Sequence, residues 1–307
     1  MQQQWHWGID LGGTKIEGVV FSTSPELKVL VRERIPTERQ KGYHHILHQI
    51  QKMIGLLVSK TGQNPVQIGI GTPGTYDLTS KSIKNSNTTV LNGEDLVGDL
   101  TSHTGIPFIT ANDANCFALA ETVLGAGKHA KVTDKTVFGI ILGTGVGGGI
   151  VVWGNALAGL HGIAGEWGHN FLDESGGKCY CGKTGCVETI ISGPALEKYY
   201  ASISGKNLPL KKIANEALKD TDPAAQETID RLCRFFGKAI AVPLNIMDPD
   251  AVIIGGGVGN IDALYTFGKQ HALSHVFNNQ LQTEFLKPVL GDSAGVFGAG
   301  LLTFQGL

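Results

Sequence analysis

A glycine-rich stretch near the start of the chain has the residue types that bind nucleotide phosphates. It reads Asp10-Leu-Gly-Gly-Thr-Lys15 and follows an apolar strand pattern. Its glycines free the backbone to approach a polyanion, Thr14 offers a hydroxyl, and Asp10 can orient a magnesium ion through its water ligands. The spacing matches neither the Rossmann fingerprint nor the GxxxxGK[ST] loop, so it disfavours those nucleotide-binding folds.

An aspartate at the predicted start of a helix can act as a general base. The chain reads Asn112-Asp113-Ala-Asn115 after an apolar strand pattern at residues 107–109. Phosphoryl transfer to a hydroxyl needs a carboxylate that takes the proton, and the amide of Asn112 can hold a neighbouring hydroxyl. The alternative is that Asp113 serves only as a helix N-cap. The phosphate-binding stretch favours the catalytic interpretation.

A cluster of cysteines predicts a metal site. Three of the five cysteines fall within eight residues, at Cys179, Cys181 and Cys186. Three thiolates and one imidazole make a closed tetrahedral site, which is typical of structural zinc. We expect His169 as the fourth ligand, with His161 as the alternative, and the clustering disfavours a disulfide framework. Glu166, His169 and Glu188 would then share a zinc-braced wall suited to binding sugar hydroxyls.

The phosphate-binding stretch belongs to a unit that occurs twice. Residues 5–21 and 137–153 both read as a strand, a glycine-rich turn and a second strand. When the two are aligned on their glycines, Leu11 matches Leu142 and Asp10 is replaced by Ile141. Two similar lobes that each begin with such a hairpin imply a cleft between them. The alternative is a chance likeness between two common glycine-rich hairpins.

Other patterns predict the elements that position these motifs. Apolar periodicity indicates helices at 44–58, 112–124, 223–247 and 295–302, and strands at 66–70 and 251–257. We therefore expect a small α/β lobe of residues 1–110 and a larger α/β lobe of residues 111–294 that carries the zinc loop. The C-terminal segment of residues 295–307 is expected to pack back on the first lobe.

The composition of the 307 residues predicts a well-packed globular protein. Hydrophobic residues make up 42% and charged residues 17%, which favours a large core over disorder. The formal net charge is −2 without a long basic run, so we expect no nucleic-acid partner. Residues 136–160 carry no charge, but their glycines favour two strands over a membrane span. Without a signal-peptide pattern, we expect a cytoplasmic protein.

Taken together, these motifs resemble the ROK family (repressors, open reading frames and sugar kinases), and within it the bacterial fructokinases and mannokinases. The resemblance spans nearly the whole chain and also covers residues 69–74, 142–145 and 255–257. It implies the actin/hexokinase-like fold, a duplicated ribonuclease H-like α/β fold with two lobes and an interlobe cleft. It also implies ATP-dependent phosphorylation of fructose, mannose or glucose at position 6, with ATP, Mg²⁺ and structural Zn²⁺, usually by a homodimer.

The resemblance further implies roles for individual residues. Asp113 is similar to the base that deprotonates the sugar hydroxyl, and Asp10 to a magnesium or phosphate organiser. The residues implied for sugar binding are Gly74, Asn87, Asn112, Asp113, Glu166, His169 and Glu188. Those implied for ATP binding are Asp10, Gly12, Gly13, Thr14, Lys15, Gly143, Thr144, Gly145, Gly255 and Gly256. The implied zinc ligands are His169, Cys179, Cys181 and Cys186.

Three alternative functions stay open at this point. The 84–93 loop is more similar to fructokinases and mannokinases, but an N-acetylglucosamine or N-acetylmannosamine kinase is the alternative within the enzymes. A sugar-responsive ROK repressor would carry an N-terminal helix-turn-helix, for which the first strand at His6 leaves no room. A sugar-sensing or degenerate kinase without turnover is the third alternative.

Overall fold

The first half of the chain forms a five-stranded mixed sheet. The structure is a computed structural model that describes residues 5–24 and 26–304, so the ends of the predicted 1–110 lobe and 295–307 segment lie outside the described residues. In spatial order the strands are β3 (Lys28–Pro36), β2 (Lys15–Ser22), β1 (His6–Leu11), β4 (Ile68–Thr72) and β7 (Phe108–Asn112). The first three pair antiparallel, and β4 and β7 add in parallel.

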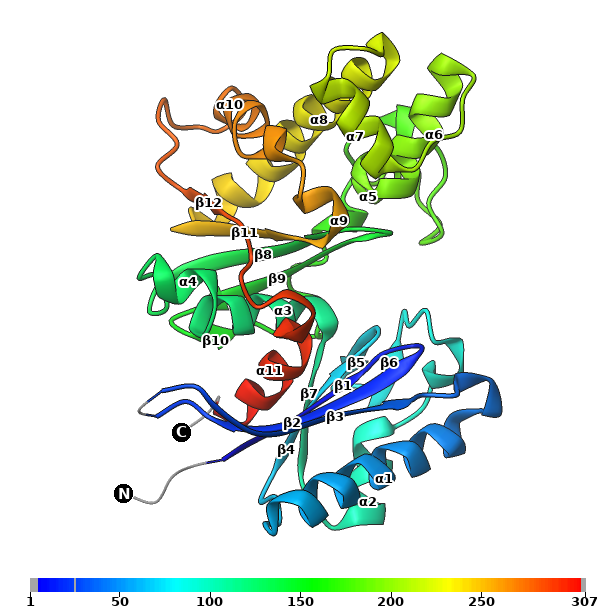
Figure 1. The fold of residues 1–307 in the computed structure, drawn as a ribbon, viewed down its shortest axis with the longest axis vertical. Coiled ribbons are helices and arrows are strands. Elements are labelled where there is room, and N and C mark those ends of the chain that lie inside the picture. Colours follow the sequence, from blue (N-terminus) through cyan, green and yellow to red (C-terminus); the bar gives the residue numbers. More distant parts are fainter. Residues whose placement is uncertain (1–4, 25, 305–307) are drawn as a thin grey trace.

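The second half repeats this topology. In spatial order its strands are β10 (Asn155–Ala156), β9 (Val146–Val152), β8 (Thr136–Leu142), β11 (Ala251–Gly255) and β12 (Glu284–Leu286). Again the first three pair antiparallel and the last two add in parallel. The predicted duplication is confirmed, because chance likeness between two hairpins would not extend to whole sheets. The fold is the expected actin/hexokinase-like arrangement (Figure 1).

Two helices, α3 (Asp113–Val123) and α11 (Ala294–Leu301), lie between the sheets (Figure 1). Glycines allow them to approach the strands and each other. A Cβ at Gly8 of β1 would lie 2.3 Å from the carbonyl oxygen of Val296, and one at Gly139 of β8 would lie 2.5 Å from the Cβ of Ala118. Gly8 and Gly139 stand three residues before the matched Leu11 and Leu142, so the duplicated strands make room for helices at equivalent positions.

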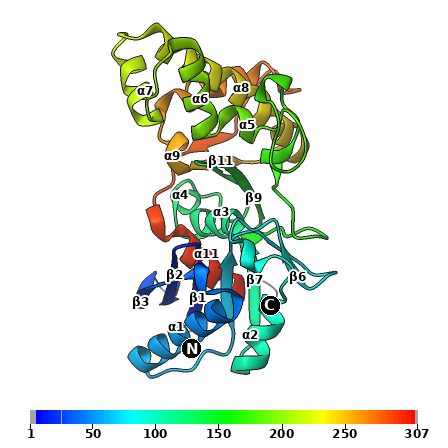
Figure 2. The ribbon, with the colours of Figure 1, turned by 90° about the vertical axis from the view of Figure 1, so that its right-hand side faces the viewer.

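Apart from α4, the remaining helices lie on the outer sides of the two sheets (Figure 2). On the first sheet these are α1 (Tyr43–Thr61) and α2 (Leu96–Thr104). On the second half they are α5 (Glu188–Ile191), α6 (Gly193–Ser204), α7 (Leu210–Leu218), α8 (Pro223–Met247), α9 (Gly256–Gly259) and α10 (Phe267–Leu273). The core of α8 packs on the second sheet, where Phe236 and Ile240 join Phe138 and Ile140 in one buried cluster.

Shorter elements complete the chain. The hairpin of β5 (Thr75–Asp77) and β6 (Ser82–Lys84) stands beside the first sheet, and α4 (Ala126–His129) follows α3. The 3₁₀ segments are η1 (Arg39–Lys41), η2 (Thr89–Leu91), η3 (Trp167–His169), η4 (Glu174–Gly176), η5 (Asp262–Leu264), η6 (Gly291–Ser293) and η7 (Leu302–Phe304). Among the described residues no helix has the length and apolar character that a bilayer crossing requires, and the uncharged stretch of residues 136–160 forms strands β8 to β10.

Candidate active site

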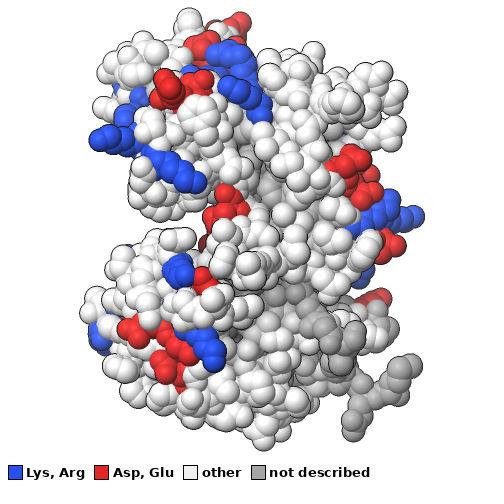
Figure 3. All heavy atoms as spheres, turned by 180° about the vertical axis from the view of Figure 1, so that it is seen from behind, with Lys and Arg blue, Asp and Glu red and all other residues white. Residues whose placement is uncertain are grey.

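The two glycine-rich turns occupy equivalent places in the two halves. Each is closed by one backbone hydrogen bond, from Gly12 N to Lys15 O and from Gly143 N to Gly145 O, both 2.9 Å long. Both turns point to the same side of the molecule in Figure 1. On that side, Figure 3 shows a hollow between the two halves, with acidic side chains at its inner end. The exposed hydroxyl residues of the turns are Thr14 and Thr144.

Asp10 lies in a crowded acidic environment at the end of β1. Burial, followed by the charges of Asp113 and Glu17, raises the pKa of Asp10 to about 6. Its carboxylate packs against the backbone of two glycines. A Cβ at Gly71 would lie 3.5 Å from Oδ1 of Asp10, and one at Gly295 would lie 3.1 Å from Oδ2. A divalent cation would relieve this repulsion between carboxylates, so the residues present fit a magnesium ion held near Asp10.

Asp113 is the first residue of α3, but it is not the residue that caps the helix. The N-cap is Asn112, whose Oδ1 accepts a hydrogen bond from the backbone nitrogen of Asn115 at 2.8 Å. The interpretation of Asp113 as only an N-cap is therefore wrong. One carboxylate oxygen of Asp113 accepts from the backbone nitrogen of Ala114 at 2.8 Å. Solvent reaches the side chain, yet the surrounding protein removes much of its hydration and raises the pKa of Asp113.

Close packing on β9 positions the segment that carries Glu166 and His169. The indole nitrogen of Trp167 donates to the carbonyl oxygen of Gly147 at 3.0 Å. A Cβ at Gly168 would lie 2.0 Å from the carbonyl oxygen of Val146, so only glycine allows this approach. The segment is therefore fixed on the strand that begins at the second glycine-rich turn.

Glu166 connects this segment to the first sheet. The side-chain nitrogen of Asn112, at the end of β7, donates to Oε1 of Glu166 at 3.3 Å. Burial raises the pKa of Glu166, the charges of Asp113 and Glu188 raise it further, and His169 opposes the change. Five of the predicted sugar-binding residues thus lie near one another around Glu166. They are Asn112, Asp113, Glu166, His169 and Glu188.

The four predicted zinc ligands lie together. The ligand atoms of His169, Cys179, Cys181 and Cys186 are all within 4.8 Å of one another. The Sγ of Cys179 is 3.6 Å from Nδ1 of His169, and the Sγ atoms of Cys181 and Cys186 are 3.6 Å apart. Two sulfur atoms bound to a tetrahedral zinc would be separated by about 3.8 Å, given zinc–sulfur bonds of about 2.3 Å. The donor set and spacing therefore fit zinc.

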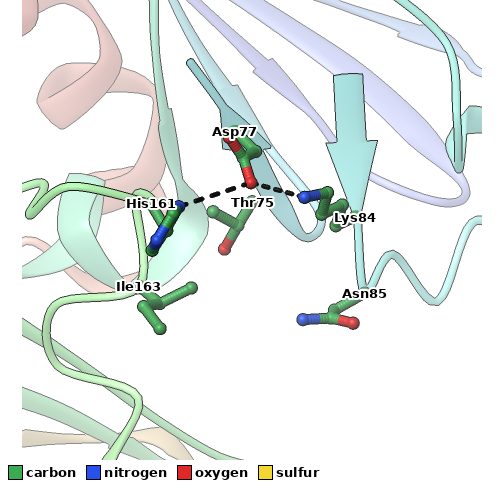
Figure 4. A pocket seen from close by; sticks show the side chains of 6 residues that line it. All are labelled: Thr75, Asp77, Lys84, Asn85, His161 and Ile163. Carbon is green, nitrogen blue, oxygen red and sulfur yellow. Dashed lines mark hydrogen bonds and ion pairs between the residues drawn. The ribbon is translucent and has the colours of Figure 1, made fainter. Parts of the chain in front are cut away.

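His161 lies elsewhere. Its Nδ1 is 3.7 Å from Oδ2 of Asp77, whose carboxylate also accepts from Lys84. These side chains line a pocket of about 330 Å³ between β5–β6 and the 157–163 loop (Figure 4). The lining residues are Thr75, Asp77, Lys84, Asn85, His161 and Ile163. The geometry therefore groups His169, and not His161, with the cysteines.

Two further predicted sugar-binding residues lie in the first half. Gly74 has a φ of 91°, and a Cβ there would lie 2.6 Å from the carbonyl oxygen of Lys84. Glycine is therefore required for the turn to pack on the 84–93 loop. Asn87 is exposed on that loop, between β6 and η2.

The remaining predicted nucleotide residues surround the second turn. Gly255 ends β11, and Gly256 has a φ of 83°, with a Cβ position only 2.2 Å from the carbonyl oxygen of Leu142. The backbone nitrogen of Gly193 donates to the carbonyl oxygen of Gly143 at 2.8 Å. The ends of β8 and β11 and the start of α6 thus meet at the second glycine-rich turn.

Lys15 shares its charge with a buried carboxylate. Its Nζ is 3.5 Å from Glu17, which also accepts hydrogen bonds from Arg32 and, at 2.7 Å, from Arg34. Burial alone would raise the pKa of Glu17, but the hydrogen bonds from the two arginines outweigh it and lower the pKa. Lys15 is therefore only partly available to a phosphate.

Tyr180, which lies beside the predicted sugar-binding residue His169, was not predicted from the sequence. The hydroxyl of Tyr180 lies 3.0 Å from Nε2 of His169, and the two rings contact edge to face. A sugar that binds to this nitrogen would have to displace Tyr180, whose side chain is largely exposed. The only signal in the sequence is its place between Cys179 and Cys181.

Known proteins with the same architecture extend this picture. The ROK family model matches residues 6–305. A glucokinase from Halalkalibacterium halodurans is 35% identical over 331 aligned positions, which cover 99% of this chain and 96% of the relative. An N-acetyl-D-glucosamine kinase from Photobacterium profundum is 33% identical over 311 positions, covering 98% and 99%.

A solved structure gives the same result in three dimensions. The ROK family glucokinase from Streptomyces griseus, in complex with glucose and AMPPNP, is 28% identical with a TM-score of 0.74. The match covers 99% of this chain and 100% of that one. The family model, the two relatives and the shared fold all span nearly the whole molecule. The chain therefore belongs to the ROK family, and its similarity to sugar kinases of that family covers nearly its whole length.

Proposed function

We propose that this ROK sugar kinase transfers the terminal phosphoryl group of ATP to the 6-hydroxyl of a hexose, with fructose, mannose or glucose as the acceptor. The observation that carries the proposal is the grouping of Asp113 with Asp10 and with the Asn112–Glu166 pair. In this proposal a proton acceptor, a residue that organises magnesium and sugar-binding side chains come together in one site.

Asp113 acts as the general base. The backbone nitrogen of Ala114 holds one carboxylate oxygen, which leaves the other for the sugar hydroxyl. The raised pKa of Asp113 makes it a better proton acceptor. As the sugar oxygen bonds to phosphorus, its proton passes to Asp113 and the bond to ADP breaks, so the reaction yields ADP and hexose 6-phosphate.

Two cations assist from separate places. Magnesium, when bound, neutralises charge on the phosphates, and the crowded carboxylate of Asp10 supports its role in holding the ion through water. His169, Cys179, Cys181 and Cys186 would hold the zinc, which when bound would brace the loop that carries Glu166 and Glu188. We expect a cytoplasmic homodimer, in keeping with the family resemblance.

The sugar-binding side chains form two groups. Asn112 and Glu166 hold one set of hydroxyls, and His169 with Glu188 hold another, while Gly74 and Asn87 border the 84–93 loop. The similarity of that loop to the loops of fructokinases and mannokinases supports an unmodified hexose as the phosphoryl acceptor. The similarity to an N-acetyl-D-glucosamine kinase supports a second candidate, phosphorylation of an N-acetylhexosamine.

A coupled ADP-release assay with Mg-ATP tests the proposal and separates the candidates. The panel comprises fructose, mannose, glucose, N-acetylglucosamine and N-acetylmannosamine. We expect kcat/KM for at least one unmodified hexose to exceed that for both N-acetyl sugars by about tenfold or more. The reverse order would establish the second candidate. ADP release that no sugar stimulates would contradict both and leave a sugar-sensing role.

A further inference from the structure

A cationic side chain lies beside the first glycine-rich turn but outside the predicted nucleotide residues. A Cβ at Gly13 would lie 2.9 Å from Nη1 of Arg39 and 3.2 Å from Oγ1 of Thr88. Arg39 belongs to η1, which follows β3, and Thr88 immediately precedes η2. The turn backbone therefore meets a guanidinium and a hydroxyl that come from two separate loops.

The Arg39 guanidinium is available to a ligand. Within residues 5–24 and 26–304 it forms no ion pair or hydrogen bond, and it is exposed. The neighbouring Glu38 pairs instead with Lys41 at 2.9 Å and with His45 at 2.7 Å. A guanidinium presents a planar fork of donors that matches phosphate oxygens, so an unpaired one at a glycine-rich turn favours binding of an anion.

Thr88 gives independent support for a ligand at this place. Its side chain is 1% exposed, and its Oγ1 has no hydrogen-bond partner among the residues that the structure describes. A buried hydroxyl without a partner is destabilising, and most such groups in native proteins have a hydrogen-bond partner. Because Oγ1 lies beside Gly13 and Arg39, an oxygen of a ligand bound there would supply the missing partner.

The chain holds Arg39 in place through the residue two positions before it. Thr37 donates from its hydroxyl to Gly12 O at 2.6 Å and from its backbone nitrogen to Thr14 O at 3.0 Å. Glu38 then takes a left-handed conformation, with a φ of 53°, which is uncommon for a non-glycine residue. The start of η1 is thereby fixed to the turn, and Arg39 is directed at Gly13.

We propose that Arg39 and Thr88 bind the terminal phosphoryl group of ATP at the β1–β2 turn. The inference rests on the proposed kinase function and adds two residues to it. Gly13, Arg39 and Thr88 all precede β7, so this contact is built within the first half and needs no movement of the second. As the phosphoryl group passes from ADP to the sugar oxygen, Arg39 neutralises charge on its non-bridging oxygens.

Calorimetric titration with Mg-AMPPNP and Mg-ADP, without sugar, tests the proposal. A charged hydrogen bond is worth about 1.5–3 kcal/mol, so Arg39→Gln should weaken AMPPNP binding by about 10- to 100-fold. Binding of ADP, which lacks the terminal group, should change by no more than about twofold. Arg39→Lys should retain part of the difference, because it keeps the charge without the planar fork. Lys52→Gln, at an exposed site on α1, is the matched charge control and should bind both nucleotides normally.

Thr88 is tested in parallel by a pair of variants. Thr88→Val removes the hydroxyl at nearly constant volume and should weaken AMPPNP binding selectively, whereas Thr88→Ser should not. Equal losses for AMPPNP and ADP in Arg39→Gln, or no loss for either, would overturn the inference. Because no sugar is present, an ADP-release panel without turnover would reject the proposed function and still leave this nucleotide test decisive for Arg39.

Discussion

The Oε2 atom of Glu188 lies 2.9 Å from the backbone nitrogen of Val146, so a residue from the zinc loop closes on the second glycine-rich turn. A Cβ at Gly145 would lie only 2.6 Å from the same oxygen. The predicted sugar wall and the predicted nucleotide turn are therefore joined by one hydrogen bond. Glu188 lies only two residues after Cys186. The zinc loop therefore supports the sugar-binding residues and the nucleotide turn together.

Glu188→Ala should consequently impair both substrates. We expect the KM values for sugar and for ATP each to rise by about fivefold or more, because the turn loses its acceptor while the sugar loses a ligand. Initial-rate measurements with each substrate varied in turn provide the test. Glu166→Ala is the comparison, since its carboxylate contacts Asn112 and not the turn, and it should raise only the KM for sugar. Identical effects in the two variants would contradict the coupling.

Asp113→Asn should lower kcat by about 10²- to 10⁴-fold, because the amide cannot accept the hydroxyl proton. Sugar binding should persist, since the side chain keeps its shape and position. Steady-state kinetics and a sugar titration measure the two effects. Asp134→Asn, at an exposed site, is the matched control. Turnover like that of the wild type in the Asp113 variant would remove the catalytic assignment.

The magnesium requirement should depend on pH through Asp10. With a pKa of about 6, Asp10 is mostly protonated at pH 5.5 and ionised at pH 7.5. We therefore expect about four times more Mg²⁺ for half-maximal rate at pH 5.5 than at pH 7.5, from the change in ionised fraction. Magnesium titrations of the initial rate at saturating ATP and sugar give both values. A requirement that stays constant across this range would contradict a role for the Asp10 carboxylate.

Asp10 should also reduce the stability of the ligand-free protein. Its folded pKa, about 6, exceeds the ordinary 3.8, so the protonated form favours folding below pH 3.8 and this stabilisation is lost as the pH rises through 6. The cost at pH 7.5 is at most about 3 kcal/mol. Asp10→Asn should therefore raise the Tm at pH 7.5 by a few degrees, and by less at pH 4.5. An unchanged or lower Tm at pH 7.5 would refute this.

Metal analysis of the purified protein should give about one zinc per chain. Cys186→Ser should lose the ion, lower the Tm and raise the KM for sugar, because the loop that carries His169 and Glu188 is no longer held. Cys233, a buried cysteine on α8 outside the cluster, supplies the control Cys233→Ser, which should retain zinc. A zinc-free wild-type protein whose Cys186→Ser variant behaves normally would disprove the site.

Much of the fold could be predicted because its signals are local. Helix α8 begins at Pro223 and ends at Met247, as the sequence predicts, since Asp222 caps it and the apolar periodicity is long. Strand β4 lies at Ile68–Thr72, two residues beyond the predicted 66–70, because its glycines pair in the sheet rather than end it. The edge strands β10 and β12 were missed, since two or three residues carry no period-two signal. The longer edge strand β3 and the helices α2, α6, α7 and α10 were not predicted either.

The candidate site also combines residues with local sequence signals and residues that only the folded chain brings together. The grouping of Glu166, His169 and the cysteines could be predicted because they lie close in sequence. The approach of Arg39 to Gly13 could not, since it depends on where the chain returns after the long strand β3. The same holds for Thr88, because the sequence does not show that its hydroxyl is buried without a hydrogen-bond partner.

The close contact between α3 and α11 has a consequence for heat denaturation. A Cβ at Gly298 would lie 1.8 Å from the carbonyl oxygen of Cys116, so the two helices touch backbone to backbone. Each helix packs on a different sheet, so unfolding of either half would expose buried apolar residues of the other half to water. We therefore expect a single cooperative transition in scanning calorimetry, in which the van't Hoff and calorimetric enthalpies agree.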